Sequence, residues 1–317
     1  MTGIAQVGCG HWGKNLARNF SEAGVLRAIV DGNPITSAEI SKRLSVPILT
    51  FEEVLSSDNI QGIALATPAE THAELGIRAL KAGKHLFVEK PIALSVPDAE
   101  ALINTAKECG RILMVGHLLQ YHSVFQKLLA EVKAGKIGDL QYVYSNRMSL
   151  GKFRTEEDVM WSFAPHDASM LVALAGEPEE VHYSGASFVS DGLDDWSILN
   201  MKFPNNVSGH IQTSWCHPFK EQRLVVIGTN GMLVFEDSNP EWSEKLAFYK
   251  HTIDKRAAVP VPSKADVEYL NVVKTEPLRA ECDEFIACIQ EGRQALTDGA
   301  EGIAVLRVLT QAEASKG

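Results

Sequence analysis

The sequence predicts two domains: a doubly wound α/β domain with a parallel sheet, followed by an α+β domain with a mostly antiparallel, open-faced sheet. The 317 residues are more than one ordinary hydrophobic core holds. The first 117 residues alternate short apolar runs with helical patterns, whereas the remainder is rich in short strands separated by turn signals. We therefore place the domains at residues 1–117 and 118–317.

The N-terminal domain is expected to consist of βαβ units, because strand-like and helix-like segments alternate along it. Strands are predicted at Ile4–Val7, Leu26–Val30, Ile60–Thr67, His85–Val88 and Ile112–Val115. Helices are predicted at Trp12–Ala23, Glu70–Ala82 and Pro97–Cys109, each followed by a glycine where a C-terminal cap belongs. This order of segments predicts the doubly wound parallel sheet.

The C-terminal domain is expected to begin with a helix near Tyr121–Ala134, a strand Leu140–Met148 and a helix Pro165–Ala175. Five further strand-like runs predict one antiparallel sheet: Val181–Phe188, Trp196–Phe203, Ser208–Trp215, Arg223–Ile227 and Met232–Glu236. Helices Pro277–Glu291 and Gly299–Ala314 end the chain. We expect these two helices to cover one face of the antiparallel sheet and to leave the other face open for a ligand or a partner subunit.

The composition is typical of a globular protein, with 45% hydrophobic and 22% charged residues. A formal charge of −10 disfavours binding to nucleic acid or to anionic membrane surfaces. The five cysteines are an odd number without a Cys-x-x-Cys pair, which favours reduced thiols. Without a signal peptide or an apolar run of about 20 residues, we expect a cytoplasmic protein that does not insert into a membrane.

A glycine motif, GCGHWG at residues 8–13, directly follows the first predicted strand and opens a helix. Gly8 permits a tight turn, Gly10 lets the backbone approach a pyrophosphate, and Gly13 lets helix and strand pack closely. The phosphates of a dinucleotide would then lie at the helix N-terminus, beside His11 and Trp12. The motif predicts a Rossmann domain; a glycine-rich turn without a ligand is the alternative.

Asp31 ends the second predicted strand, 18 residues beyond Gly13. A carboxylate at this spacing accepts a hydrogen bond from the ribose 2′-hydroxyl and repels a 2′-phosphate. We therefore expect NAD, rather than NADP, as the cofactor. The alternative is a chance solvated aspartate.

Two more segments follow predicted strands at the carboxyl edge of the sheet, where open α/β sheets bind ligands. Thr67 and Pro68 are expected to contact the dinucleotide, although a proline turn that opens the next helix is the alternative. The tripeptide Glu89-Lys90-Pro91 follows the fourth strand. A lysine beside the cofactor can hold a substrate hydroxyl or take part in proton transfer, whereas a surface Glu–Lys ion pair is the alternative.

Four motifs together make the chain resemble the glucose–fructose oxidoreductase and inositol dehydrogenase family: GCGHWG at residues 8–13, ATPAETH at 66–72, EKP at 89–91 and MVGH at 114–117. The resemblance covers nearly the whole chain and implies an NAD-dependent oxidoreductase that acts on a CH–OH group. It implies that Lys90 lies at the reacting carbon and that Glu89 and Pro91 shape the nicotinamide pocket. We also expect His72, at the end of the second motif, to contact the cofactor.

The family usually carries a second motif, Asp-x-x-x-His, on a helix, and this chain departs from it. Ser162 stands in place of the aspartate, His166 is kept, and Asp167 follows it. His166 is expected to accept a proton, because an imidazole titrates near working pH and oxidation of an alcohol requires its proton to leave. Asp167 is a further catalytic candidate that could meet the substrate or cap the helix. The pair could also bind a metal, but no third ligand has helical spacing, so no metal is expected.

The segments 145–154 and 159–167 resemble the branch of the family that oxidises UDP-N-acetyl sugars, the UDP-N-acetylglucosamine 3-dehydrogenases of lipopolysaccharide (lipid A) synthesis. Arg147, Lys152 and Arg154 would supply positive charge for a diphosphate, with surface solvation as the alternative. His117 and Tyr121 complete the expected substrate-binding set.

The resemblance implies transfer of a hydride from the 3-position of a UDP-N-acetylhexosamine to NAD, which gives a 3-keto nucleotide sugar and suits an aminotransferase as the next enzyme. A dehydrogenase of a free sugar or inositol is one alternative. A non-catalytic NAD(H)-binding sensor is another, and Ser162 keeps it open. We also expect a homo-oligomer, with a tetramer favoured by the resemblance, because an open sheet face exposes apolar side chains.

Overall fold

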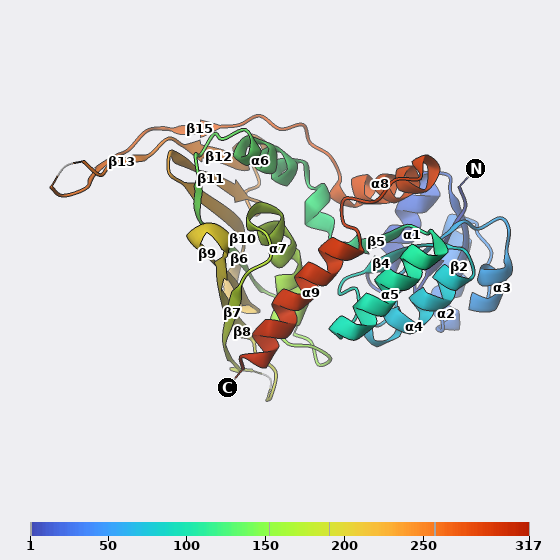
Figure 1. Ribbon diagram of the computed structural model, residues 1–317. Coiled ribbons are helices and arrows are strands. Elements are labelled where there is room, and N and C mark those ends of the chain that lie inside the picture. Colours follow the sequence, from blue (N-terminus) through green and yellow to red (C-terminus); the bar gives the residue numbers. More distant parts are fainter. Residues whose placement is uncertain (1, 152, 190, 257, 317) are drawn as a thin grey trace. The chain divides into compact units, whose positions relative to one another are not determined.

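The computed structural model describes residues 2–151, 153–189, 191–256 and 258–316, drawn in Figure 1. The chain forms two compact units. The first contains Met1–Tyr121 and Glu276–Leu306, and the second contains His122–Thr275 and Arg307–Gly317. The chain thus returns to the first unit near its end, a feature that the expected division after residue 117 did not include.

The first unit is built on a five-stranded parallel sheet with the order β2-β1-β3-β4-β5. Its strands are β1 (Ile4–Val7), β2 (Leu26–Val30), β3 (Gly62–Leu65), β4 (His85–Glu89) and β5 (Leu113–Gly116). All five predicted strands are present, and β3 is shorter than expected. The strand order confirms the predicted doubly wound topology, in which the strand order reverses beside β1.

The helices of the first unit include two that the sequence analysis missed. These are α2 (Pro34–Leu44), capped by the Asn33 side chain, and α3 (Phe51–Ser56), which starts with a capping box between Thr50 and Glu53. The others are α1 (Gly13–Glu22), α4 (His72–Lys81), α5 (Val96–Cys109) and α8 (Pro277–Glu291), with 3₁₀ turns η1 (Ala69–Thr71) and η2 (Leu118–Tyr121). α9 (Gly299–Ala314) begins in this unit and ends in the second.

The prediction that both terminal helices cover the antiparallel sheet is wrong for α8. Its Phe285 makes edge-to-face contacts with Phe20 of α1 and Phe87 of β4, with ring centroids 6.4 and 5.8 Å apart. Leu278 and Cys282, on the same helix, are buried in the same core. The apolar stripe of α8 therefore packs on the parallel sheet.

The second unit contains an eight-stranded sheet with the order β15-β12-β11-β10-β6-β9-β8-β7. Neighbouring strands are antiparallel except for β6 and β9, which confirms the predicted mostly antiparallel sheet. The strands are β6 (Leu140–Leu150), β7 (Glu180–Ala186), β8 (Trp196–Phe203), β9 (Val207–Ser214), β10 (Cys216–Gly228), β11 (Gly231–Glu236), β12 (Leu246–Tyr249) and β15 (Val267–Tyr269). The 3₁₀ turns η3 (Pro204–Asn206) and η4 (Trp242–Glu244) connect some of them.

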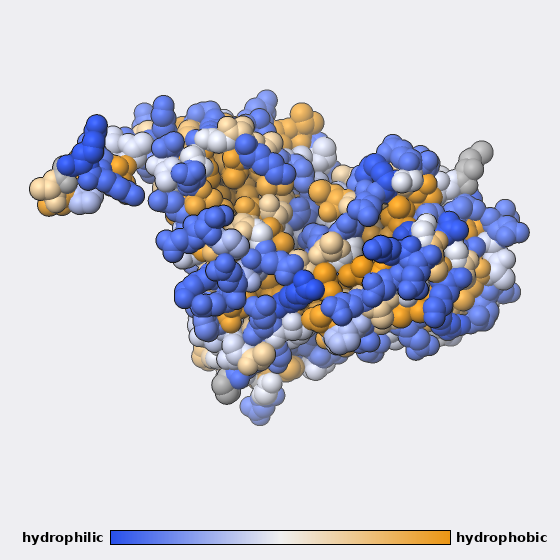
Figure 2. Space-filling model, in the orientation of Figure 1, coloured by the Kyte–Doolittle hydropathy of each residue, from blue (hydrophilic) through white to orange (hydrophobic). Residues whose placement is uncertain are grey.

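A two-stranded hairpin, β13 (Thr252–Asp254) and β14 (Val261–Ser263), extends away from this sheet (Figure 1). Ile253, Val259 and Val261 on the hairpin are exposed. Figure 2 shows hydrophobic and strongly hydrophilic surface side by side on this hairpin.

Two helices of the second unit, α6 (Ser123–Lys133) and α7 (Val159–Ala175), lie on one face of the sheet (Figure 1). α7 begins six residues before the predicted start at Pro165, so that prediction was wrong. The Asp158 side chain accepts a hydrogen bond from the Trp161 N–H and caps the helix, and Pro165 lies inside it. Of the helices in the described ranges, none combines the length and the apolar character needed to cross a membrane.

Candidate active site

The glycine turn between β1 and α1 has no room for side chains. Gly8 has φ of +82°, and a Cβ there would lie 2.5 Å from the carbonyl oxygen of Ala66. A Cβ on Gly13 would lie 2.0 Å from the carbonyl oxygen of Gly8, so the start of α1 packs directly on the turn. Gly10 has open space around it, and no side chain caps the first turn of α1. This cradle of backbone suits a pyrophosphate at a helix N-terminus.

Asp31, directly after β2, links the end of this strand to the glycine turn through a hydrogen bond. Its carboxylate accepts hydrogen bonds from the backbone N–H of Cys9 (2.6 Å) and of Asn33 (2.7 Å). Burial, with a further contribution from Asp31, raises the pKa of the Cys9 thiol to about 12. Cys9 is therefore a neutral filler of the turn, while Asp31 stays partly exposed at the expected ribose position.

His72 connects the loops that follow β3 and β4. Its side chain is 1% exposed, with Nδ1 2.8 Å from the carbonyl oxygen of Pro91 and Nε2 2.9 Å from that of Thr67. Burial lowers the pKa of His72, which favours a neutral ring with a single N–H to donate. These contacts let His72 position the two loops, and its contact with the cofactor stays a prediction.

Glu89 and Lys90 lie at the carboxyl end of β4, as the sequence predicted. The Glu89 side chain is buried, and its Oε2 accepts a hydrogen bond from the Lys90 backbone N–H at 3.3 Å. Burial raises the pKa of Glu89 to about 7, while the charge of Lys90 and a hydrogen bond with the Trp12 side chain oppose the rise. The carboxyl group of Glu89 and the amine of Lys90 thus both lie at the end of β4, on the edge of the sheet where open α/β sheets bind ligands.

His117 and Tyr121, expected to bind substrate, have partners within the first unit. His117 is 1% exposed, and its Nδ1 lies 2.5 Å from Oε2 of Glu301. The Tyr121 hydroxyl hydrogen-bonds to Thr297 Oγ1 at 2.8 Å within the core of the unit. Both side chains are buried there, so these contacts give them a structural role, and their contact with substrate stays a prediction.

In the second unit, α7 presents His166 on the same face as Ser162, because residues four apart share one side of a helix. Ser162 is buried and His166 is half-buried. The family's Asp-x-x-x-His spacing is therefore kept as Ser-x-x-x-His on a continuous helix. A hydroxyl replaces the carboxylate at the first position.

Asp167 points toward the sheet instead. It is 1% exposed and pairs with Arg147 of β6, with 2.5 Å between Arg147 Nε and Asp167 Oδ2. Ser145 Oγ donates a second hydrogen bond to this carboxylate. The pair fixes α7 to β6, which supports a positioning role for Asp167 and removes Arg147 from the cations available to a diphosphate.

Arg154 remains half-exposed and pairs with Glu157 at 3.0 Å, so it can still contribute charge to a ligand. Lys152 lies outside the described residues.

A set of contacts that the sequence analysis missed holds the start of α7. Lys316 Nζ lies 2.7 Å from Asp158 Oδ2, and Trp161 Nε1 donates to Glu313 Oε2 at 3.0 Å.

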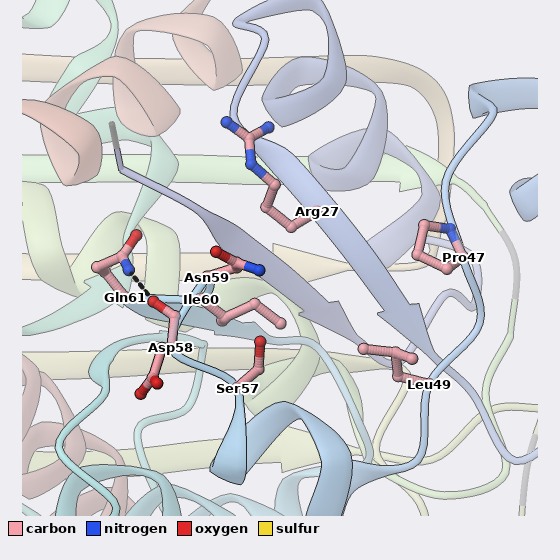
Figure 3. A pocket seen from close by; sticks show the side chains of 8 residues that line it. All are labelled: Arg27, Pro47, Leu49, Ser57, Asp58, Asn59, Ile60 and Gln61. Atoms are coloured by element: carbon pink, nitrogen blue, oxygen red, sulfur yellow. Dashed lines mark hydrogen bonds between the residues drawn. The ribbon is translucent and has the colours of Figure 1, made fainter.

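A cleft of about 720 Å³ lies at the opposite, amino edge of the parallel sheet (Figure 3). Its lining residues are Arg27, Pro47, Leu49, Ser57, Asp58, Asn59, Ile60 and Gln61. None of them belongs to the motifs at the carboxyl edge. Within the described ranges, no three His, Cys, Asp or Glu side chains are grouped so as to hold a metal ion.

The parallel sheet, the glycine cradle and the lysine at the carboxyl edge define an NAD-dependent oxidoreductase that acts on a CH–OH group. The chain belongs to the oxidoreductase family with an NAD-binding Rossmann fold, whose sequence model matches residues 2–117. The model of the GFO/IDH/MocA C-terminal domain matches residues 125–234.

Similar proteins act on different alcohols. The UDP-N-acetylglucosamine 3-dehydrogenase of Acidithiobacillus ferrooxidans is 27% identical over 98% of this chain and 95% of its own. The myo-inositol 2-dehydrogenase of Thermotoga maritima is 25% identical over 94% of this chain and 91% of its own. A solved structure of the Acidithiobacillus enzyme superposes with a TM-score of 0.86 at 25% identity, covering 98% of this chain and 96% of that one. A levoglucosan dehydrogenase solved with NADH, at 18% identity, shares the fold with a TM-score of 0.84.

Proposed function

We propose that this protein oxidises the 3-hydroxyl of a UDP-N-acetylhexosamine, specifically UDP-N-acetylglucosamine, to the 3-keto sugar with NAD as the oxidant. The observation that carries the proposal is the similarity to the Acidithiobacillus UDP-N-acetylglucosamine 3-dehydrogenase, which extends over nearly all of both chains. The inositol dehydrogenases are similar over almost the same length, so oxidation of a free polyol is the competing function.

The residues of the first unit suit this reaction. Gly8, Gly10 and Gly13 hold the pyrophosphate, with Asp31 at the ribose, and NAD when bound accepts the hydride. Lys90 lies at the reacting carbon, with Glu89 and Pro91 beside the nicotinamide. Thr67 and Pro68 line the dinucleotide, and His11 and Trp12 lie next to the phosphates.

Two side chains are proposed to contact the substrate hydroxyl that is oxidised. Lys90 or His166 accepts its proton as the carbonyl forms, and the other group holds the oxygen in place. Asp167 acts through Arg147 by fixing the helix that carries His166. Arg154, with Lys152, supplies charge for the diphosphate.

The wider setting is also a proposal. A 3-keto nucleotide sugar is a substrate for an aminotransferase, which would place the enzyme in the cytoplasm in lipopolysaccharide (lipid A) synthesis. We propose a homotetramer as the working form.

The test is a scan of nucleotide sugars, free sugars and inositols for NADH absorbance, with a ketone trap or an aminotransferase present to draw the reaction forward. UDP-N-acetylglucosamine should give the highest kcat/KM. NADH formation only with free sugars or inositols would establish the competing function. NAD binding without turnover of any of these alcohols would favour a sensor.

A further inference from the structure

The hairpin of β13 and β14 projects from the second unit without a core of its own. We call residues 250–266, which join β12 to β15, the arm (Figure 1). From Thr252 to Tyr269, every residue that the structure describes is exposed. An isolated two-stranded hairpin is only marginally stable in water, because it buries too little apolar surface. A second surface that covers the arm would supply the missing burial.

The arm is attached to the sheet at its base only by local contacts. The backbone N–H of Ala265 donates to His251 Nδ1 at 3.0 Å, and Lys136 Nζ lies 3.1 Å from Glu268 Oε1 on β15. At the far end, Arg256 pairs with Asp254 at 2.9 Å within the arm itself, and the Arg256 side chain is 91% exposed. The arm thus has a fixed origin, while its far end faces water.

Apolar side chains lie along this exposed segment. Ile253 is 59% exposed, Val261 54% and Val259 73%. Ile253 is directly opposite Pro262 in the register of the two strands, so these two side chains share one face of the hairpin. A cluster of exposed apolar residues is typical of a contact surface, whereas apolar residues scattered singly are ordinary.

Two prolines limit how the arm can bind a partner. Pro260 and Pro262 have no backbone N–H, and Pro262 is the middle residue of β14. The outer edge of β14 therefore offers few donors to an added strand. A partner would contact the side chains of the arm rather than extend its sheet.

The arm also differs in charge from the rest of the chain. It contains four cations, Lys250, Lys255, Arg256 and Lys264, and two anions, Asp254 and Asp266. Its net charge is +2, so the remaining residues carry −12 of the total of −10. The acidic remainder repels nucleic acid and anionic membranes but attracts a basic arm. A second copy of the chain fits this combination, because it presents the same acidic surface.

We propose that the arm is a self-association surface: in the homotetramer, each arm packs its apolar and basic side chains on the acidic surface of another copy. The inference rests on the proposed homotetramer. The open face of the antiparallel sheet can join only two copies, because a two-fold contact closes on itself. Four copies need a second contact surface, and the arm supplies it.

The arm contact acts in the assembly rather than between single chains. In a symmetric tetramer each two-fold contact occurs twice, so two pairs of copies are joined through two arm contacts. Once the first of these has formed, the second forms at a high effective concentration. Between two single chains only one such contact forms, and this reinforcement is missing.

The first experiment removes the arm. Replacing residues 252–263 with Asn-Gly keeps the base and closes it with a two-residue turn. Light scattering at micromolar concentration should report a twofold lower mass than for the wild type, two copies instead of four. Ile253→Asp combined with Val261→Asp, in the full-length chain, should have the same effect, because it places carboxylates against an acidic surface. The control, Ile35→Asp in the first unit, changes a residue that is 79% exposed and should leave the mass unchanged.

The second experiment tests the charge of the arm and leaves its apolar residues in place. Lys255→Glu combined with Lys264→Glu should also lower the mass, because the arm then repels the acidic surface. The matched variant, Lys255→Arg combined with Lys264→Arg, keeps the charge and should retain the wild-type mass.

The same mass for the wild type and for the protein without its arm would overturn the proposal, whatever that mass is. Binding of the wild type alone to vesicles of phosphatidylcholine and phosphatidylserine would, in that case, assign the arm to a membrane. A wild type of two copies that dissociates into single chains without the arm would support the arm contact and correct the number of copies. NADH formation from UDP-N-acetylglucosamine, measured separately, tests the proposed reaction.

Discussion

At the scale of single residues, the Asp31 carboxylate accepts hydrogen bonds from two backbone N–H groups and has further lone pairs that can accept one from a ribose hydroxyl. Replacing Asp31 with alanine should weaken NAD binding about ten- to a hundredfold, because a hydrogen bond to a charged group is lost. The substitution should also narrow the difference in affinity between NAD and NADP, since the charge that opposes a 2′-phosphate is gone. Equilibrium titration with both dinucleotides measures this, with Asp58→Ala, at the opposite edge of the sheet, as the control. Tighter binding of NADP than NAD by the wild type would contradict the assignment.

Lys90→Ala and His166→Ala should each lower kcat by about 10²–10⁴, the range of one acid–base group, and leave NAD affinity nearly unchanged. Steady-state kinetics and NAD titration of the two variants provide the measurement. If one variant alone loses activity, that residue is the base and the other holds the substrate. Wild-type turnover in both would remove the catalytic assignment.

Glu89 should make stability depend on pH. Its pKa rises from 4.5 to about 7 on folding because of burial, so the folded protein binds the proton more tightly than the unfolded chain does. The contribution of this group to stability is then greatest below pH 4.5 and is lost as the pH rises toward about 7. The side chain of Glu89→Gln cannot lose a proton. As the pH rises from 4.5 to about 7, the free energy of unfolding of this variant should therefore increase relative to that of the wild type by up to about 3 kcal/mol. Urea unfolding at about pH 5 and about pH 8 tests this; parallel pH dependence of the two proteins would contradict it.

The residues that we propose to bind the cofactor could be placed in the fold from the sequence, because their spacing along the chain determines their position. Gly8, Gly13 and Asp31 each follow a strand whose apolar run is visible in the sequence. The position of α8 could not be found in this way, since its Phe285 packs against Phe87, nearly 200 residues away in the sequence. The ion pair of Asp167 with Arg147 likewise joins a helix to a strand that the sequence does not show to be neighbours.

At the scale of elements, the start of α7 depends on Asp158, which caps the helix and pairs with Lys316. Asp158→Ala should lower the free energy of unfolding by about 1–2 kcal/mol, the usual loss of an N-cap. Turnover should fall as well, because His166 lies on this helix. Urea midpoints and kcat of Asp158→Ala, compared with those of Asp191→Ala in an exposed loop, measure both effects. An effect no larger than that of the loop variant would contradict the capping role.

Apolar periodicity predicted the strands of the parallel sheet and β6 to β11, but not β12 to β15, which are only three or four residues long. Helix boundaries were predicted less well. The predicted helix start at Pro165 was wrong because the helix begins at Val159, after the N-cap Asp158. α2 and α3 were not predicted, although the residues that cap them, Asn33, Thr50 and Glu53, are of types that favour a helix start. The packing of α8 on the parallel sheet is a tertiary choice, and an amphipathic helix does not reveal which sheet it covers.

At the scale of the whole molecule, the antiparallel sheet has two different faces. Val143, Leu224 and Leu233 are buried toward the face on which α6 and α7 lie. Their alternating neighbours point to the other face and form a patch in which Val225 is buried and the others are partly exposed: Tyr142, Tyr144, Val225, Ile227, Met232 and Val234. Val234, Val225 and Tyr144 are adjacent in register across three strands, so the patch is continuous.

A second copy of the chain, packed face to face, would remove this patch from water, which is why we predict a homo-oligomer. Light scattering at micromolar concentration should report a multiple of the single-chain mass of 34.6 kDa, with four copies as the proposal. Val234→Glu places a charge in the patch and should lower the mass toward one chain, because burying an unpaired carboxylate at an interface is costly. Val273→Glu, at a position that is 79% exposed, should leave the mass unchanged. A wild-type mass of one chain would show that the patch is tolerated in water or covered within the chain, and would contradict the prediction.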